Sequence, residues 1–373
     1  MRKSSKMLIV VACLGFMSSS PPEIPLADTR SSVGSLCTVA VLPLSNLTDA
    51  RDAGEKIMAF LLPVLSGKGF RVLENERVAD FLEKKRIRYV DSLVTSDARV
   101  MSSELGIKYI LTGSIFSYSS RVIPQVGIHV RLIDASTNEM VWCAASSMTG
   151  DDEPGLFNAG RIETRDEMIR KVIEHLFSSL NMKKQDGSIL ISGKKRGGEN
   201  RILAPNPHYY RKKGSEIEKY DSIALIPFSN KSGDKYAAKI VHDYLFVNLS
   251  SSADVKIAEP AELRRVLSRG KIRNANILTH GIMDLLRTEL GVKGVISGTV
   301  YTFREGVNGA MGGEPEIEIF AQMTDTATGE IIWAARQRRE GNDSIISYDI
   351  GRVRNIDSLA GSAIANMLST LVK

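Results

Sequence analysis

The sequence predicts an α/β fold of two tandem homologous domains, each a mixed sheet with helices packed on it. The stretch "CTVAVLPLSN", which starts at Cys37, returns as "DSIALIPFSN", which starts at Asp221. A chain of 373 residues also exceeds what one hydrophobic core usually organises. With 43% hydrophobic and 25% charged residues, close to ordinary globular composition, each half can bury a core of its own.

Both copies show the same order of elements: strand, helix, strand, two helices, three strands and a final helix. The first helix of each copy carries an apolar stripe, with Leu61 and Leu65 matched by Leu245 and Leu249. The helical crossovers predict parallel pairing of the early strands, and the tight turns predict an antiparallel meander after them. We therefore expect domains at 38–182 and 221–373, joined by a basic flexible linker at 183–220.

The late strands of each copy have one face that is shared and one that differs. In the first copy Ile128, Val130 and Leu132 alternate with His129 and Arg131. The matching strand of the second copy also alternates, but its other face has different side chains. Because alternate residues of a strand point to opposite faces, the shared apolar face is expected to pack against helices. The face that differs is expected to contact partners.

Several polar, Gly, Pro and Trp positions recur in both copies. A residue that each copy keeps is most simply one that the fold needs, such as an Asn at a helix start, a Gly at a close backbone approach or a Trp in the core. The sequence therefore assigns these positions to structure. They are Pro43, Asn46, Gly113, Asp134 and Trp142 in the first copy and Pro227, Asn230, Gly298, Asp325 and Trp333 in the second.

The N-terminus has the pattern of an export signal. Three basic residues precede the apolar run Met7 to Met17, which is too short to span a bilayer. Within the run, Cys13 follows small and apolar residues and resembles the acylated cysteine of a bacterial lipobox. Residues 1–27 are thus predicted to be a signal, with lipidation at Cys13 or ordinary cleavage near Ala27. Acylation would anchor the chain to a membrane surface.

If Cys13 is acylated, two cysteines remain, Cys37 and Cys143. Both are missing from the second copy, where Asp221 and Ala334 take their places. A disulfide between them would suit an oxidising envelope compartment. Two small buried thiols at strand ends are the alternative interpretation.

No arrangement of residues predicts catalysis, a cofactor site or a metal site. The nearest phosphate-loop pattern, Gly187 to Gly193, has one residue too many and lacks the Ser or Thr that would meet magnesium. The five histidines are scattered, with no two at ligand spacing. We expect no enzyme, no cofactor and no metal.

Positive charge is concentrated in the predicted linker. The chain has a formal net charge of +6, and the linker places Tyr209 and Tyr210 beside Arg211, Lys212 and Lys213. Such a cluster could stack bases and neutralise phosphates. Because the export signal takes the chain out of the cytoplasm, no nucleic acid is expected as a partner, and anionic lipid or an acidic protein fits better.

The ordered motifs "VLPLSN", "ELG" with "ILTGS", and "DASTNEMVW", repeated in the second copy, resemble a bacterial envelope lipoprotein superfamily. It includes the curli secretion channel subunit (CsgG) and the penicillin-binding-protein activator (LpoB). The motifs are also similar to lipoproteins of polysaccharide export and of the flagellar outer membrane. The resemblance implies a non-enzymatic lipoprotein on the periplasmic side of the cell envelope, anchored to the outer membrane. It also implies a role in assembling or activating envelope machinery, for peptidoglycan synthesis or for secretion and appendage assembly.

Two departures from that superfamily leave alternatives open. The connections Ser119 to Gln125 and Arg304 to Pro315 are too short to span a bilayer, which disfavours a pore. The tandem arrangement puts the family's oligomer geometry in doubt. The expected partners are an envelope protein complex and a membrane surface reached through the lipid anchor, with a homo-oligomer left open. The alternative functions are a subunit of an oligomeric outer-membrane export ring and a nucleic-acid-binding protein that uses the basic linker.

Overall fold

The computed structural model describes residues 37–88, 90–91, 93–119, 123–152, 161–185, 188–193, 205–272, 278–306, 313–345 and 351–372. The predicted signal segment 1–27 and the predicted lipidation site Cys13 lie outside these residues. Residues Ser35–Lys373 form one compact unit. We use "N-terminal half" for elements β1 to β8 and "C-terminal half" for elements β9 to α8.

The N-terminal half is built on a mixed sheet in the order β3-β1-β4-β5-β6, with β2 beside β4. Strand β1 pairs parallel with β3 and β4, whereas β4, β5 and β6 pair antiparallel. The strands are β1 (Thr38–Val41), β2 (Ser45–Asn46), β3 (Arg71–Val72), β4 (Tyr109–Ser119), β5 (Gln125–Asp134) and β6 (Met140–Thr149).

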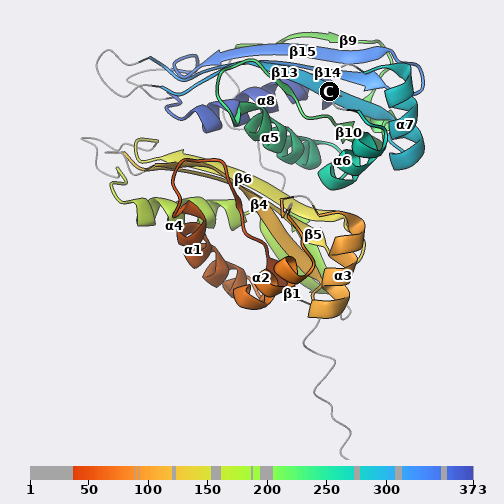
Figure 1. The fold of residues 1–373 in the computed structure, drawn as a ribbon. Coiled ribbons are helices and arrows are strands. Elements are labelled where there is room, and N and C mark those ends of the chain that lie inside the picture. The colour runs from red at the N-terminus through yellow and green to blue at the C-terminus, as the bar shows by residue number, and fades with distance from the viewer. Residues whose placement is uncertain are drawn as a thin grey trace, which may run out of the picture. The chain divides into compact units, whose positions relative to one another are not determined.

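Four helices cover this sheet. Helices α1 (Ala53–Gly67) and α4 (Arg165–Phe177) pack on one face, which we call the inner face, around a core of β4, β5 and β6 side chains (Figure 1). Helices α2 (Asn75–Lys84) and α3 (Thr95–Leu105) pack on the opposite, outer face, against side chains of β1 and the start of β4. The rest of the outer face is left for another element to cover.

The C-terminal half repeats this arrangement. Its sheet runs β12-β10-β13-β14-β15-β9, with β11 beside β13. Helices α5 (Ala237–Ser252) and α8 (Ile356–Val372) pack on its inner face, and α6 (Pro260–Arg269) and α7 (His280–Leu290) on its outer face (Figure 1). The strands are β9 (His208–Arg211), β10 (Ser222–Leu225), β11 (Ser229–Asn230), β12 (Lys256–Ile257), β13 (Gly294–Arg304), β14 (Glu316–Asp325) and β15 (Ile331–Glu340).

These sheets and helices confirm the predicted fold class: both sheets are mixed, with early parallel strands followed by an antiparallel meander. The boundaries proposed for two domains stay a prediction. The buried side chains of α1 match those of α5 place for place, with Leu61 and Leu65 corresponding to Leu245 and Leu249.

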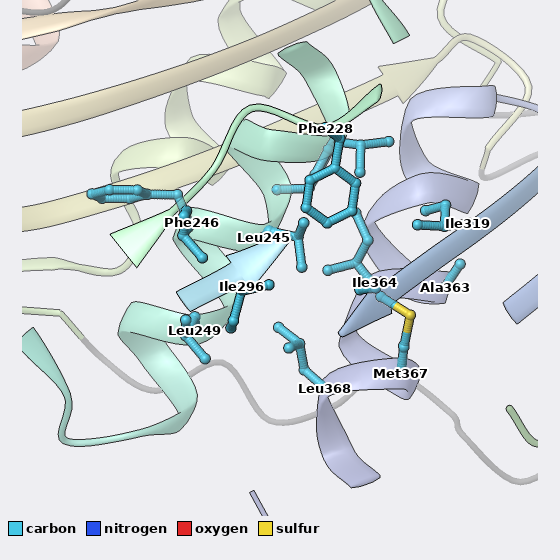
Figure 2. Close-up of a cluster of buried hydrophobic side chains, with 14 of the residues drawn as sticks. Phe228, Leu245, Phe246, Leu249, Ile296, Ile319, Ala363, Ile364, Met367 and Leu368 are labelled. Atoms are coloured by element: carbon cyan, nitrogen blue, oxygen red, sulfur yellow. The ribbon is translucent and has the colours of Figure 1, made fainter. Parts of the chain in front are cut away.

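The core beneath the second sheet is made by helices α5 and α8 together with side chains of β10, β13, β14 and β15. Figure 2 shows Leu245 and Leu249 of α5 beside Ile364 and Leu368 of α8, with Ile296 of β13 among them. In the same view Phe246 points away from this group. Helix α5 therefore buries side chains on two sides, because Phe246 is itself only 1% exposed.

Backbone conformation at the turns follows the sequence. Asn138, in the turn between β5 and β6, and Gly329, in the turn between β14 and β15, take positive φ values of 61° and 73°, which both residue types tolerate. Gly106 and Gly291 close α3 and α7 in the left-handed conformation, with φ of 67° and 66°. Glycine fits there because a Cβ is disfavoured at such angles.

Residues 183–220 differ from the expected flexible linker in their described part. Strands β7 (Leu180–Gln185) and β8 (Ser188–Gly193) form an antiparallel hairpin, and Met182 and Ile191 pack against the N-terminal core. Strand β9 pairs antiparallel with β15, so the segment extends the second sheet by one strand. Backbone pairing to an open sheet edge needs no apolar sequence pattern, and the basic composition of the segment gave no sign of it.

Among the helices that the structure describes, none has both the length and the apolar character needed to cross a membrane.

Candidate interaction surfaces

The outer face of the first sheet is covered by the C-terminal half of the same chain. Phe116 of β4 and Ala145 of β6 belong to the same buried cluster as the side chains of α5 and α8. The rings of Phe116 and Tyr244 lie with their centroids 5.5 Å apart. We call this contact the inter-half interface.

A buried carboxylate on α5 lies near the centre of the inter-half interface. Asp243 accepts hydrogen bonds from Ser114 Oγ at 2.7 Å and from Lys239 Nζ at 2.7 and 2.8 Å, and His129 Nδ1 lies 3.4 Å from it. Burial alone would raise the pKa of Asp243, but Lys239 and His129 outweigh it and hold that pKa well below its usual range. Burial lowers the pKa of His129, which favours the neutral imidazole despite the nearby carboxylate.

A second polar link joins β5 to the start of α6. Arg131 donates to Glu259 Oε2 at 2.9 Å and to the Asp91 carbonyl oxygen at 2.6 Å, and its guanidinium lies 5.3 Å from the Phe246 ring centroid. Both charged side chains are buried. Burial raises the pKa of Glu259, and the neighbouring Arg131 opposes that rise. An ion pair this deep makes the two halves depend on each other, because either charge alone would be stranded.

The far end of the interface joins β6 to the start of α8. Asn355 Nδ2 donates to Ser147 Oγ at 2.7 Å, and Ser358 Oγ donates to the Ser147 carbonyl oxygen at 3.0 Å. Asp357 Oδ2 lies 3.5 Å from Ser147 Oγ. Burial raises the pKa of Asp357 to about 7. At the rim, Lys256 pairs with Glu139 at 2.5 Å.

The corresponding outer face of the second sheet is open and lined by charge. Arg336 and Arg338 of β15 are 58% and 61% exposed, and they pair at 2.8 Å with Glu318 and Glu316 of β14. The Arg336 guanidinium also lies 5.3 Å from the ring centroid of Tyr301, itself 37% exposed. The two halves therefore differ on their outer faces: the first is covered by protein and the second is exposed.

Strand register shows which residues correspond on the two outer faces. Ser114 pairs with His129 across β4 and β5 as Thr299 pairs with Phe320 across β13 and β14. The same register relates residues of the first sheet at the inter-half interface to residues on the outer face of the second sheet, of which Tyr301, Arg336 and Arg338 are exposed and the others half-buried. These pairs are Phe116 and Tyr301, Arg131 and Gln322, Cys143 and Ala334, Ala145 and Arg336, and Ser147 and Arg338. At two of these places, small neutral residues of β6 on the covered face, Ala145 and Ser147, thus correspond to the arginines of β15 on the open face.

The recurring residues take matching structural places. Asn46 Oδ1 accepts from Thr48 N at 2.9 Å, and Asn230 Oδ1 accepts from Ser232 N at 3.1 Å, each just before a helix. A Cβ on Gly113 would lie 2.0 Å from the His129 carbonyl oxygen.

The remaining markers fill turns and cores. Asp134 and Asp325 each accept backbone N–H groups of the turn that follows. Their pKa values are lowered because these hydrogen bonds outweigh partial burial. Trp142 Nε1 donates to Ser179 and Trp333 Nε1 donates to Thr370, while Pro43 and Pro227 lie exposed after the first strands. A Cβ on Gly298 would lie 2.2 Å from the Phe320 carbonyl oxygen.

The proposed disulfide is not present: Cys37 and Cys143 are both free thiols. Cys37 lies directly before β1, and Cys143 lies in β6, with β4 and β5 between those strands. Three inter-strand spacings amount to roughly 14 Å, well beyond the roughly 7 Å that a disulfide allows between Cα atoms. Cys143 instead packs against the C-terminal core, and burial raises the pKa of its thiol to about 12.

The other predicted ligand sites can be placed as well. Tyr209 and Tyr210 are both exposed on β9, but neighbours in a strand point to opposite faces, so they do not form one stacking platform. Within the described ranges, no group of His, Cys, Asp and Glu could hold a metal ion. A polar cavity of about 30 Å³, which Thr149 and Arg354 help to line, has room for ordered water.

The buried polar residues of α5 and α6 were missed by sequence reasoning. Asp243 lies on a helix whose described side chains are mostly buried on more than one side, including His242, Tyr244 and Phe246. A helix that is apolar nearly all round is a buried helix, and that signal was available in the sequence. The partners of Asp243 and Glu259 lie in the other half of the chain, which no local pattern reveals.

Comparison with solved structures finds similar folds at low similarity. A PelC dodecamer from Paraburkholderia phytofirmans is 21% identical, with a TM-score of 0.31, and the match covers 44% of this chain and 97% of that one. A lipoprotein from Neisseria meningitidis is 14% identical, with a TM-score of 0.27, over 32% of this chain and 89% of that one. The LpoB C-terminal domain from Escherichia coli is 18% identical, with a TM-score of 0.25, over 31% of this chain and 84% of that one. No protein-family model matches the chain, and no curated protein matches it.

Proposed function

We propose that this chain is a non-enzymatic, exported lipoprotein that acts by binding, as part of the machinery that builds or operates the cell envelope. The open outer face of the second sheet is the observation that carries the proposal. It exposes Arg336, Arg338 and Tyr301 at positions whose counterparts in the first sheet already bind a protein surface. The outer face of the first sheet thus contacts protein within the chain, and the equivalent face of the second sheet is exposed.

The polar residues of the first sheet support binding over catalysis. His129, Arg131 and Ser114 lie on the outer face of the strands and have side chains that could take part in chemistry. Each is buried in the inter-half interface and contacts α5 or the start of α6. A buried residue that holds two surfaces together has no access to a substrate.

The N-terminal sequence supports the proposed location. Basic residues before the apolar run Met7 to Met17 favour export, and Cys13 offers an acylation site. An acyl anchor would hold the chain on the periplasmic side of the outer membrane. The motif resemblance to envelope lipoproteins fits this location and a role in peptidoglycan synthesis or in secretion and appendage assembly.

Photo-crosslinking in intact cells tests the proposal. A benzophenone side chain in place of Tyr301 samples the open face, and the same side chain in place of Arg269, 62% exposed on α6, samples a control surface. We expect a protein crosslink in the envelope fraction from position 301 and none from position 269. A chain that gives no crosslink from position 301, or that fractionates with the cytoplasm, would contradict the proposed function.

A further inference from the structure

Two surfaces of the chain correspond to the two sides of the inter-half interface, and no other helix or strand in the described part of the chain covers them. One is the open outer face of the second sheet, which corresponds to the covered face of the first. The other is the outward side of α1 and α4, which corresponds to the side of α5 and α8 that contacts the first sheet. Glu55 and Ala59 of α1, both exposed, correspond to Lys239 and Asp243 of α5.

We propose that the open face of the second sheet binds the outward side of α1 and α4 of a second copy of this chain, in the packing that joins the two halves. This inference rests on the proposed function, in which the same face binds a protein, and it identifies that protein as a second copy of the chain. The two surfaces differ from each other, so the contact is head to tail. Such a contact adds copies in one direction and gives a ring if it closes or a filament if it does not.

The correspondence between α4 and α8 is fixed by two equivalent hydrogen bonds. Trp142 of β6 donates to Ser179 after α4, and Trp333 of β15 donates to Thr370 in α8, in each case 37 residues further along. Asp166 therefore corresponds to Asp357. Likewise Ser147 corresponds to Arg338 through the strand register.

Repeating the internal contact between copies would bring opposite charges together. Ser147 meets Asp357 within the chain, so Arg338 would meet Asp166 of the next copy. At the rim, Lys256 pairs with Glu139, and the corresponding residues are Arg71 and Glu330, again of opposite sign.

An aromatic contact and a hydrogen-bonding contact of the inter-half interface could also form between copies. The aromatic pair Phe116 and Tyr244 corresponds to Tyr301 and Phe60. The Arg131 contact with Glu259 corresponds to Gln322 with Glu74, a pair that can hydrogen-bond.

One internal contact would be lost between copies. Glu262 accepts from Thr95 N and Oγ1 within the chain, whereas the corresponding residues are Arg77 and His280, which do not make such a bond. The contact between copies thus joins the same elements as the inter-half interface, but its charged residues are exposed, not buried. It relies on exposed charge, so added salt should weaken it, whereas the buried inter-half interface should be insensitive.

Sedimentation velocity of the purified full chain, at about 50 mM and about 500 mM salt, tests this inference. We expect association at low salt and mostly monomer at high salt. Arg338→Glu and Asp166→Arg should each weaken association about tenfold, because each sets like charges against each other. The double variant should recover association, since the carboxylate introduced at position 338 faces the guanidinium introduced at position 166 of the next copy. Arg269→Glu, a charge reversal at the last residue of α6 and outside the corresponding contacts named above, should associate like the unchanged chain.

Two results would overturn the inference: a chain that stays monomeric at low salt, or a double variant no better than the single ones. The benzophenone at position 301 separates this failure from failure of the proposed function. A crosslink between two copies supports both proposals. A crosslink to a different envelope protein overturns the inference and leaves the proposed function standing, while no crosslink overturns both.

Discussion

Asp357 is a buried carboxyl whose charge depends on pH near neutrality. It is 1% exposed, and burial raises its pKa from 3.8 to about 7. The folded chain therefore holds the proton more tightly than the unfolded chain between those two values. Stability from this group is fully present below about pH 4 and is lost as pH rises through about 7, by about 4 kcal/mol at most.

Urea unfolding of Asp357→Asn beside the unchanged chain measures that loss. The amide stays neutral at every pH, so the stability of the variant relative to the unchanged chain should grow between pH 4 and pH 7 and stay level above. A difference that does not change with pH would mean that Asp357 stays ionised in the folded chain.

At the scale of elements, a buried ion pair between Arg131 of β5 and Glu259 at the start of α6 holds the two elements together. Arg131 and Glu259 are both buried, so removing one partner strands the other charge. We expect Arg131→Gln or Glu259→Gln alone to lower the free energy of unfolding by about 3 kcal/mol or more. The double variant should recover much of that loss, because two neutral amides can hydrogen-bond.

Chemical denaturation of all four chains gives the coupling energy of this pair. Lys85 and Glu104, whose side chains are 32% and 42% exposed, form a matched surface pair. Replacing them in the same way should change stability by less than about 1 kcal/mol. Additive losses for Arg131 and Glu259 would show that the pair does not hold β5 to α6.

At the scale of elements, sequence pattern predicted what depends on neighbours along the chain. The apolar stripes of α1 and α5 followed from the spacing of their leucines, and the parallel early strands and later antiparallel meander followed from the order of helices and tight turns. Strand β9 was not predicted, because its pairing with β15 depends on an open sheet edge rather than on its own residues.

For the whole molecule, the sequence could not predict the inter-half interface, because the residues that form it lie far apart in the chain. Alternation in β5 separated an apolar face from a variable one, and the variable face was expected to contact partners. The first such partner is the other half of the chain, through Asp243 and Glu259. Sequence pattern could mark the face as variable, but it could not show which surface would cover it.

An acyl anchor at Cys13 would place the whole chain on a membrane surface, and the mass of its N-terminus tests that placement most directly. The measurement is intact-mass and N-terminal peptide analysis of the chain from cell envelopes, with Cys13→Ala as the control. We predict a mature chain that begins at a diacylated Cys13, and loss of the acyl mass in the control. An unprocessed Met1 on a chain from the soluble cytoplasm would contradict the proposed export and anchoring.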